Sequence, residues 1–397
     1  MIKDLIRLEP VSADALPAIS AQNLPVSAAD VLVFTTALSR QLMTSSDCRQ
    51  YPELIALGHW LRQGNLNALT ANIAKQSYRP LGLVVHYTPA NVDTMFIYSW
   101  ICALLMGNRN LVRVSGRDSD VQTVLLEKLR YLLLLPEHAA LHAGNQFIHF
   151  ERDDPAGPAV SMLADARVLW GGDDSVRQIR GLSCKPRCRD ISFADRFSAA
   201  LINVDALNSD GAQSADEKAE GVASALWREC DMFQQQACSS PRILFWTGEK
   251  QNWNTLTRVL SGIAVQHAPS IVQRNEQLVL AQWCIADGAA STAEQCGDLS
   301  LVHINHWHHA LLERHQGHST LFCIHIDDVQ AIAGYDHAGW QTLSYAGFEK
   351  EALFKIIRAL PIQGIDRVVP LGNALAFSPD WDGYDLFSQL GRKVVFE

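Results

Sequence analysis

Apolar and polar positions follow two different periods along this chain. Before residue 79, apolar residues recur with helical spacing, and this predicts helices over Ala29–Met43 and Tyr51–Leu61. From Arg79 onwards, short continuous apolar runs alternate with longer amphipathic stretches. That alternation is typical of strands joined by helices, so the sequence predicts an α/β protein.

The first set of alternating segments covers roughly residues 79–180. A helix is expected from an N-cap at Asp118 to Leu134, because Asp commonly caps helices, and another is expected after Gly171-Gly172-Asp173-Asp174. The remaining elements are a helix at Thr94–Met106 and strands at Leu81–His86, Asn110–Ser115, Gln146–Phe150 and Ala166–Trp170. Helices of this length between strands indicate a parallel sheet covered on both faces.

A second alternation begins near Ser198. Expected strands are Ala199–Val204, Arg242–Trp246, Leu299–Ile304, Leu321–Ile326 and Gln341–Tyr345, and expected helices are Ala215–Cys230, Asn252–Ile263, Ser270–Ile285, Asp328–Gly334 and Phe348–Leu360. We therefore predict a nucleotide-binding domain with an N-terminal helical segment over 1–197 and a second domain over 198–370. The last segment, 371–397, is expected to return to the first domain or to an oligomer interface.

Composition narrows the class of protein. The 397 residues carry 33 Lys+Arg against 42 Asp+Glu, a net charge of −9, which disfavours a nucleic-acid partner. The longest apolar stretch, Met95–Met106, is too short to span a membrane, and no secretory signal is expected. Nine scattered cysteines, an odd number, indicate reduced thiols in the cytoplasm.

The stretch Gln234–Arg242, QQQACSSPR, is the most informative for chemistry. Cys238 stands among small residues after a helical stretch, and Pro241 prevents that helix from continuing. A turn here would expose the sulfur and direct backbone N–H groups at whatever the sulfur attacks, which is what a nucleophilic thiolate needs. The alternative is that Cys238 is a buried apolar thiol, the commonest fate of a free cysteine.

A second candidate stretch is Val85–Trp100, where a strand passes through a Pro-containing turn into an apolar helix. Asn91 stands at the mouth of that helix. Its side-chain amide has two interpretations, capping the helix or donating to a developing oxyanion.

Two further stretches have features of dinucleotide binding. Arg113 ends an apolar strand, where a basic side chain reaches a ribose or its phosphate, although a salt-bridged surface arginine explains it equally well. Gly171-Gly172-Asp173 joins a strand to a helix, as at pyrophosphate sites. Neither GxGxxG nor GxxxxGK[ST] occurs, so the Rossmann fingerprint and the P-loop are excluded.

Histidines crowd between His303 and His325, and His308, His309 and His315 are conceivable metal ligands. There is no HExxH, and the pair Cys184 and Cys188 lacks a second cysteine pair. We therefore expect solvated loop histidines and no metal.

Taken together, the chain resembles the LuxC-type acyl-CoA reductases, a branch of the aldehyde dehydrogenase superfamily. The resemblance covers about residues 80–397 and rests on ordered blocks: HYTPAN at His86–Asn91, GNRNLVRVS at Gly107–Ser115, WGGDDSVRQIR at Trp170–Arg180, QQACSSPR at Gln235–Arg242, GIDRVVPLGNAL at Gly364–Leu375 and WDGYDL at Trp381–Leu386. It implies two Rossmann-like α/β lobes with the active site in the cleft between them.

The resemblance also implies roles for individual residues. Cys238 falls on the family nucleophile, and Asn91 falls on the oxyanion-hole asparagine that works with the backbone N–H of the nucleophile. Arg113 stands where a lysine usually contacts the adenosine ribose, and an arginine there favours NADPH over NADH. The cofactor region further includes Ser115, Gly171, Gly172 and Asp173. Arg367 and the block Trp381–Gly383 are family marks to which no role is assigned.

One departure from the superfamily bears on the reaction. Hydrolytic aldehyde dehydrogenases carry a glutamate that activates water, and Asp190–Ser198 offers Phe193 or a neighbour at that place. Without that base the acyl-enzyme should survive for reduction or for exchange with CoA. The resemblance therefore implies NADPH-dependent reduction of an acyl-CoA thioester, fatty acyl above all, to the aldehyde through an S-acyl-cysteine.

The resemblance implies a homo-oligomer, and an enzyme that activates or transfers acyl groups is a candidate partner. Three alternatives remain: a relative acting on another activated acyl group or an aldehyde, a non-catalytic subunit of a fatty-acid-processing complex, and a histidine-rich metal-binding module.

Overall fold

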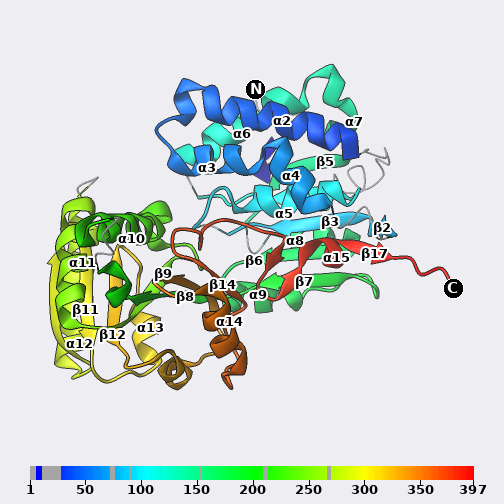
Figure 1. The fold of residues 1–397 in the computed structure, drawn as a ribbon. Coiled ribbons are helices and arrows are strands. Elements are labelled where there is room, and N and C mark those ends of the chain that lie inside the picture. The colour runs from blue at the N-terminus through cyan, green and yellow to red at the C-terminus, as the bar shows by residue number, and fades with distance from the viewer. Residues whose placement is uncertain are drawn as a thin grey trace. The chain divides into compact units, whose positions relative to one another are not determined.

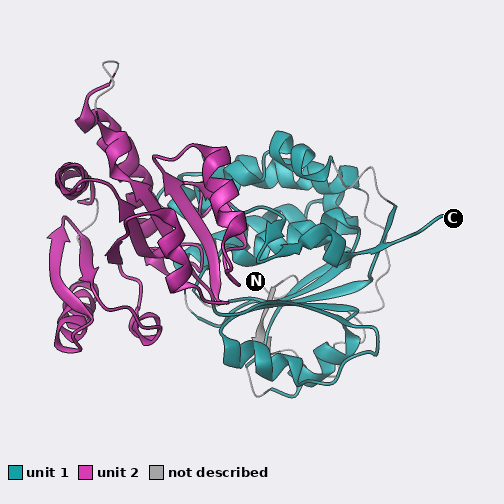
Figure 2. Cartoon of the chain, turned by 60° about the horizontal axis from the view of Figure 1, so that its bottom comes forward, with its two compact units in different colours: residues 1–195, 377–397 teal, residues 196–376 magenta. Residues whose placement is uncertain are grey.

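A computed structural model describes residues 6–10, 28–71, 77–89, 91–117, 119–151, 154–208, 213–265 and 270–397, with only the backbone over 6–10. The chain divides into two compact units (Figure 2). Unit 1 comprises residues 1–195 and 377–397, and unit 2 comprises residues 196–376. The C-terminal segment therefore belongs to unit 1.

Unit 1 is built on a six-stranded sheet in the order β1-β5-β4-β3-β6-β7. Every pairing in it is parallel. The strands are β1 (Ile6–Pro10), β3 (Leu83–Tyr87), β4 (Arg109–Arg113), β5 (Asn145–His149), β6 (Ala166–Trp170) and β7 (Arg189–Phe193). Such a sheet must be covered on both faces.

Helices cover both faces of that sheet (Figure 1). Alternate residues of β3 show the division: Val84 packs with one apolar cluster, and Leu83 and Val85 pack with another. The helices are α2 (Ala28–Thr44), α3 (Pro52–Trp60), α4 (Gln63–Thr70), α5 (Met95–Leu105), α6 (Asp120–Leu133), α7 (Ala139–Gly144), α8 (Ala156–Leu163) and α9 (Asp173–Arg180), with the 3₁₀ turns η3 (Ser46–Cys48) and η5 (Pro136–His138).

A buried polar chain crosses the first sheet at His86. Its Nδ1 lies 3.1 Å from Ser99 Oγ and its Nε2 lies 3.0 Å from Asn110 Oδ1. Asn110 Nδ2 in turn donates to Asn145 Oδ1, at 2.9 Å. Burial lowers the pKa of His86 to about 4, so this imidazole is neutral and structural.

Unit 2 contains a seven-stranded sheet in the order β10-β11-β12-β9-β8-β13-β14. Only the β10–β11 pairing is antiparallel. The strands are β8 (Phe197–Asn203), β9 (Pro241–Thr247), β10 (Ala290–Cys296), β11 (Leu299–Ile304), β12 (Thr320–His325), β13 (Trp340–Ala346) and β14 (Arg367–Pro370). The parallel strands all begin at one edge, so the residues that precede them are brought together there.

Two apolar clusters pack on the two faces of this second sheet. Its helices are α10 (Ala215–Asp231), α11 (Lys250–Ile263), α12 (Ile271–Ala286), α13 (Ala310–Arg314) and α14 (Lys350–Ala359), with η6 (Val204–Leu207), η7 (Met232–Gln235) and η8 (Val329–Tyr335). Capping boxes at Ser214 and Ser270 fix the starts of α10 and α12.

The C-terminal segment adds small elements to unit 1. These are β15 (Asp380–Trp381), β16 (Tyr384–Asp385), α15 (Leu386–Leu390) and β17 (Gly391–Lys393), which pairs with β2 (Tyr78–Pro80). The block Trp381–Gly383 forms a hairpin in which Asp382 and Gly383 both have positive φ, 51° and 72°. That is the geometry of a type I′ turn, for which Asp-Gly is a preferred sequence.

The structure corrects several element predictions. Asp118, expected as an N-cap, lies outside the described residues, and the cap of α6 is Ser119, whose side chain accepts from Gln122 N–H. The expected helix at Asp328–Gly334 is the 3₁₀ segment η8. Strand β10 was not predicted, because its five central residues are exposed and leave no apolar period.

Candidate active site

The turn that carries Cys238 lies between η7 and β9. Ser240 N–H donates to Ala237 O at 3.0 Å, which closes the expected turn around the cysteine. The nine cysteines all lie in the described part of the chain and none is in a disulfide. Cys238 is half-buried, as are Cys184 and Cys188, whereas the other six thiols are buried.

Three consecutive residues before this turn have left-handed backbones. Phe233, Gln234 and Gln235 have φ of 56°, 52° and 60°, a conformation that costs an L-residue about 1–2 kcal/mol. The buried side chain of Gln235 holds the segment in place. Its Nε2 donates to Pro241 O at 2.6 Å and to Thr320 O at 2.7 Å, and its Oε1 accepts from Thr320 N–H at 2.8 Å.

A second anchor fixes the main chain of Cys238 itself. Ser198 Oγ donates to Cys238 O at 2.8 Å and accepts from Thr342 N–H at 3.2 Å. Ser198 lies in β8 and Thr342 in β13, so the turn is attached to two strands of the sheet. A strained segment with this much side-chain support has the character of a functional turn.

In unit 1 the parallel strands β3, β4 and β6 end at one edge of the sheet, at Tyr87, Arg113 and Trp170. The strand order reverses beside β3, with β4 on one side and β6 on the other. In open α/β sheets, ligands bind at the carboxyl ends of the strands at such a point.

Asn91 lies in the loop that follows β3, on this same edge, and is exposed. The helix after it, α5, begins at Met95 with Thr94 as the N-cap residue. Asn91 is therefore not the cap, and the capping interpretation of this residue is wrong.

Arg113 ends β4 and is half-buried. Its Nη2 donates to Phe150 O at 3.0 Å, and its guanidinium carbon lies 5.5 Å from the centre of the Phe150 ring. Ser115, two residues on, is buried, and its Oγ accepts from Arg117 N–H at 3.2 Å. Arg113 and Ser115 thus lie at the end of the strand next to β3.

Gly171, Gly172 and Asp173 form the junction of β6 and α9, with Gly172 as the N-cap residue. Asp173 N–H donates to Asp195 Oδ2 at 3.1 Å, and Asp195 N–H donates to Asp173 Oδ1 at 3.1 Å. A carboxylate therefore already faces the positive end of α9. A pyrophosphate at this position would meet the negative charge of Asp195.

Phe193, predicted from the resemblance to stand near the place of the hydrolytic glutamate, is the last residue of β7. It is buried and stacks on Trp170 with ring centres 3.8 Å apart. An aromatic ring packed in this way offers no group that could take a proton from water.

The histidine-rich stretch is only partly as expected. His308 pairs with Asp287 at 2.9 Å and His303 pairs with Glu294 at 3.2 Å, both at the surface. His315 is buried, which corrects the expectation of a solvated side chain: its Nε2 lies 3.0 Å from Thr320 O, and burial lowers its pKa to about 3. Over the described residues, no group of three or more metal-ligating side chains is assembled.

Glu229 and Arg367, to which the sequence analysis assigned no role, hold the segment 372–376 of unit 2. Buried Glu229 accepts from Gly372 N–H at 2.6 Å, Ala374 N–H at 2.9 Å and Ser344 Oγ at 2.7 Å. Arg367 donates to the carbonyl oxygens of Ala374 and Ala376, at 3.1 and 3.0 Å.

Burial raises the pKa of Glu229 to about 7. Glu229 and Arg367 thus fix the segment that ends where the chain returns to unit 1 at Phe377. The sequence did contain a signal for the burial of Glu229. This glutamate lies about one helical turn after Leu226, on the apolar face of α10.

Comparisons with known proteins identify the fold first. The chain is similar to NAD-dependent aldehyde dehydrogenase from Sinorhizobium meliloti, with a TM-score of 0.67, 14% identity and coverage of 97% of this chain and 86% of that one. It is similar to Rhodopseudomonas palustris propionaldehyde dehydrogenase with bound propionyl-CoA, with a TM-score of 0.63, 16% identity and coverage of 98% and 94%. The predicted aldehyde-dehydrogenase-like fold is confirmed.

The family follows from the sequence comparison. The model of the family "Acyl-CoA reductase (LuxC)" matches residues 66–393, so the chain belongs to the LuxC acyl-CoA reductase family. Long-chain acyl-protein thioester reductase 2 from Photobacterium leiognathi is 24% identical over 172 residues, which is 43% of this chain. The alignment spans only 33% of the length of that relative.

The family implies a nicotinamide cofactor. No helix among the described residues is both long and apolar enough to cross a membrane.

Proposed function

We propose that this protein reduces a long-chain acyl thioester, acyl-CoA in the first instance, to the aldehyde with NADPH. The observation that carries the proposal is the turn around Cys238. A half-buried thiol there follows three left-handed residues, and Gln235 and Ser198 hold its main chain in place. Structural cysteines need no such support, whereas a nucleophile must be held in one orientation.

The Cys238 thiolate attacks the carbonyl carbon of the thioester. A carbon–sulfur bond forms to Cys238, the bond to the CoA sulfur breaks, and CoA leaves as its thiolate. The side-chain amide of Asn91 and the N–H of Cys238 donate to the oxygen while it carries negative charge. An S-acyl-cysteine remains.

NADPH, held by Arg113 and Ser115 among other residues of the cofactor region, would supply the hydride that reduces the S-acyl carbonyl. Asn91 and the Cys238 N–H stabilise the oxyanion a second time, and the Cys238 sulfur then departs as the aldehyde forms. Phe193 and its stacked partner Trp170 present no base for water, so reduction competes well against hydrolysis.

Some of the predicted cofactor residues fit NADPH better than others. Arg113 and Ser115, at the end of β4, suit a ribose and its 2′-phosphate, and this favours NADPH. Gly171, Gly172 and Asp173 suit the pyrophosphate by position, but the Asp195 carboxylate that bonds Asp173 N–H opposes an anion there. We assign these three residues to the cofactor region on the condition that Asp195 moves or is neutralised.

The acyl donor has a second candidate. The relative from Photobacterium leiognathi is a long-chain acyl-protein thioester reductase by name, so a protein thioester is the alternative to acyl-CoA. The attack by Cys238 is the same for both donors. We further propose that the enzyme is a homo-oligomer and that it works with a partner that activates or transfers acyl groups. A cytoplasmic location is in keeping with nine reduced thiols.

The test is covalent labelling with a radioactive long-chain acyl-CoA. Wild-type protein should retain the label after denaturation, and Cys238→Ala should not. Cys184→Ala is the matched control, because Cys184 is also half-buried but lies in unit 1, and it should label like wild type. Equal labelling of Cys238→Ala and wild type would overturn the proposal.

A further inference from the structure

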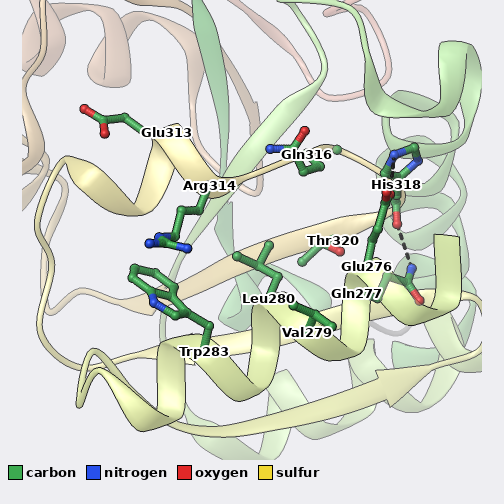
Figure 3. A pocket seen from close by; sticks show the side chains of 11 residues that line it. Glu276, Gln277, Val279, Leu280, Trp283, Glu313, Arg314, Gln316, His318 and Thr320 are labelled. Carbon is green, nitrogen blue, oxygen red and sulfur yellow. Dashed lines mark hydrogen bonds and ion pairs between the residues drawn. The ribbon is translucent and has the colours of Figure 1, made fainter. Parts of the chain in front are cut away.

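Unit 2 contains a cavity of about 220 Å³ between α12 and the segment 313–320 (Figure 3). Its apolar wall is formed by Val279, Leu280 and Trp283, which lie on one side of α12. Its polar groups stand mainly at the two ends. Nothing in the reaction proposed above uses this cavity.

At one end of the cavity stands Arg314. Its guanidinium carbon lies 4.4 Å from the centre of the Trp283 ring. Within the part of the chain that the structure describes, Arg314 has no carboxylate within ion-pair distance. The neighbouring Glu313 directs its carboxylate away from Trp283 (Figure 3). A positive charge thus lies over the end of an apolar surface.

The opposite end contains a carboxylate, that of Glu276. His318 Nε2 lies 2.8 Å from Glu276 Oε2, and Gln277 Nε2 donates to His318 O at 2.7 Å. Thr320 is buried in the wall, and its hydroxyl has no hydrogen-bond partner among the described residues. An anionic group is therefore favoured only at the Arg314 end.

The same wall contacts the segment that leads to Cys238. His318 N–H donates to Gln234 O at 3.1 Å, and the main chain of Thr320 bonds the side chain of Gln235. Gly317 has φ of +80°, and a Cβ there would lie 2.7 Å from Gln236 Nε2. The cavity and the Cys238 turn are thus on two sides of one tightly packed loop.

We propose that this cavity binds a long-chain fatty carboxylate, with its carboxylate on Arg314 and its chain along Trp283, Leu280 and Val279. An alkyl chain gains about 0.8 kcal/mol for each CH₂ removed from water, and a guanidinium is the best side-chain partner for a carboxylate. Val279 is 54% exposed at the rim, so a chain longer than the cavity continues over α12.

The identity of the chain rests on the proposed function. Hydrolysis is the slow reaction that competes with reduction of the S-acyl-cysteine: water attacks the acyl carbon, the bond to the Cys238 sulfur breaks, and the fatty carboxylate of that same acyl group is released. The ligand is therefore the hydrolysis product of the acyl-enzyme, bound beside the turn that formed it.

The test is calorimetric titration of the full-length protein with dodecanoate below its micellar concentration. Wild type should bind saturably, and Arg314→Gln should weaken binding about tenfold or more through loss of the charge-assisted bond. Val279→Asp should weaken it similarly, because it replaces an apolar contact with the alkyl chain by a charged group that loses hydration when the chain covers it. Dodecanol, which has the chain without the charge, should bind wild type and Arg314→Gln equally.

Two control variants match these changes. Leu278→Asp alters an exposed neighbour that does not line the cavity, and Arg258→Gln removes an exposed arginine of α11. Both should bind within about twofold of wild type. The proposal is overturned if dodecanoate does not saturate, or if Arg314→Gln and Val279→Asp bind like their controls.

Acyl-CoA labelling of the same samples separates the two proposals. If labelling of Cys238 persists without dodecanoate binding, the cavity assignment fails and the proposed function stands. If dodecanoate binds as expected but Cys238 is not labelled, the proposed function fails and the cavity assignment stands.

Discussion

The hydroxyl of Ser198 donates a hydrogen bond to the main-chain carbonyl of Cys238, at 2.8 Å. The same oxygen accepts from Thr342 N–H at 3.2 Å. One small side chain therefore sets the distance between the Cys238 turn and two strands of the sheet, and the orientation of the sulfur depends on it.

Replacing Ser198 by Ala should destabilise the protein and slow acylation of Cys238. The change removes the hydrogen bond to the Cys238 carbonyl and the one from Thr342 N–H, which costs about 1–3 kcal/mol in the free energy of unfolding. Ser240→Ala is the control, since its buried hydroxyl has no partner among the described residues. Urea unfolding and the rate of acyl-CoA labelling measure the two effects. Equal effects of both variants would show that Ser198 does not position the turn.

Gln235→Ala should cost more stability than Ser198→Ala. It removes three hydrogen bonds, to Pro241 O, Thr320 O and Thr320 N–H, while the left-handed backbone keeps its strain. We expect a loss of about 2–4 kcal/mol, read from thermal or urea unfolding. Gln234→Ala, at an exposed neighbour with the same backbone conformation, should cost under about 1 kcal/mol. The interpretation fails if Gln234→Ala costs more stability than Gln235→Ala.

Asn91→Ala should lower the rate of Cys238 acylation by about 10²–10³-fold, the usual effect of losing an oxyanion donor. Asn91 is exposed and is not the N-cap residue of α5, so the effect on acylation should be much larger than the effect on the melting temperature. Stopped-flow release of CoA measures the step. A large loss of stability with unchanged acylation would restore a structural role for this residue.

Asp195→Asn should strengthen NADPH binding about two- to fivefold, because it removes a carboxylate from the positive end of α9 while an amide oxygen can still accept from Asp173 N–H. Asp174→Asn, in the same first turn, is the control, since that carboxylate is paired with Arg177. Fluorescence titration of NADPH gives both affinities. Weaker binding by Asp195→Asn would remove Gly171–Asp173 from the cofactor region.

Glu229 should make stability depend on pH. Burial raises its pKa to about 7 in the folded protein, above its value when unfolded, so its contribution is complete below about pH 4.5 and is lost as the pH rises through 7. The shift corresponds to roughly 3 kcal/mol. Unfolding of Glu229→Gln should accordingly lose less stability between pH 5 and 8 than wild type or Glu220→Gln, which changes an exposed carboxyl of α10. If the stability of Glu229→Gln and of wild type changes with pH in parallel, Glu229 is not the group responsible.

Hydrophobic periodicity was enough to find most elements of both units. Ala166–Trp170 and Leu299–Ile304 were predicted with their observed bounds, because a short, mainly apolar run is typical of a buried parallel strand. Strands whose central residues are exposed were not predicted, and β10 is the example. Apolar periodicity cannot reveal a strand whose central side chains face water, even though β10 pairs with β11, the next strand along the chain.

The sequence by itself determined the family, the α/β class and the turn at Cys238, because these depend on local residue types and spacing. Only the tertiary structure decided that Thr94 rather than Asn91 is the cap residue of α5, that Asp195 faces α9, and that His315 and Glu229 are buried. It also brought Ser198 and Gln235 to the support of Cys238. Apart from the start of α5, these relations depend on positions that are separate along the chain. Side-chain burial and hydrogen bonding depend on what folding places beside a residue as well as on its sequence neighbours.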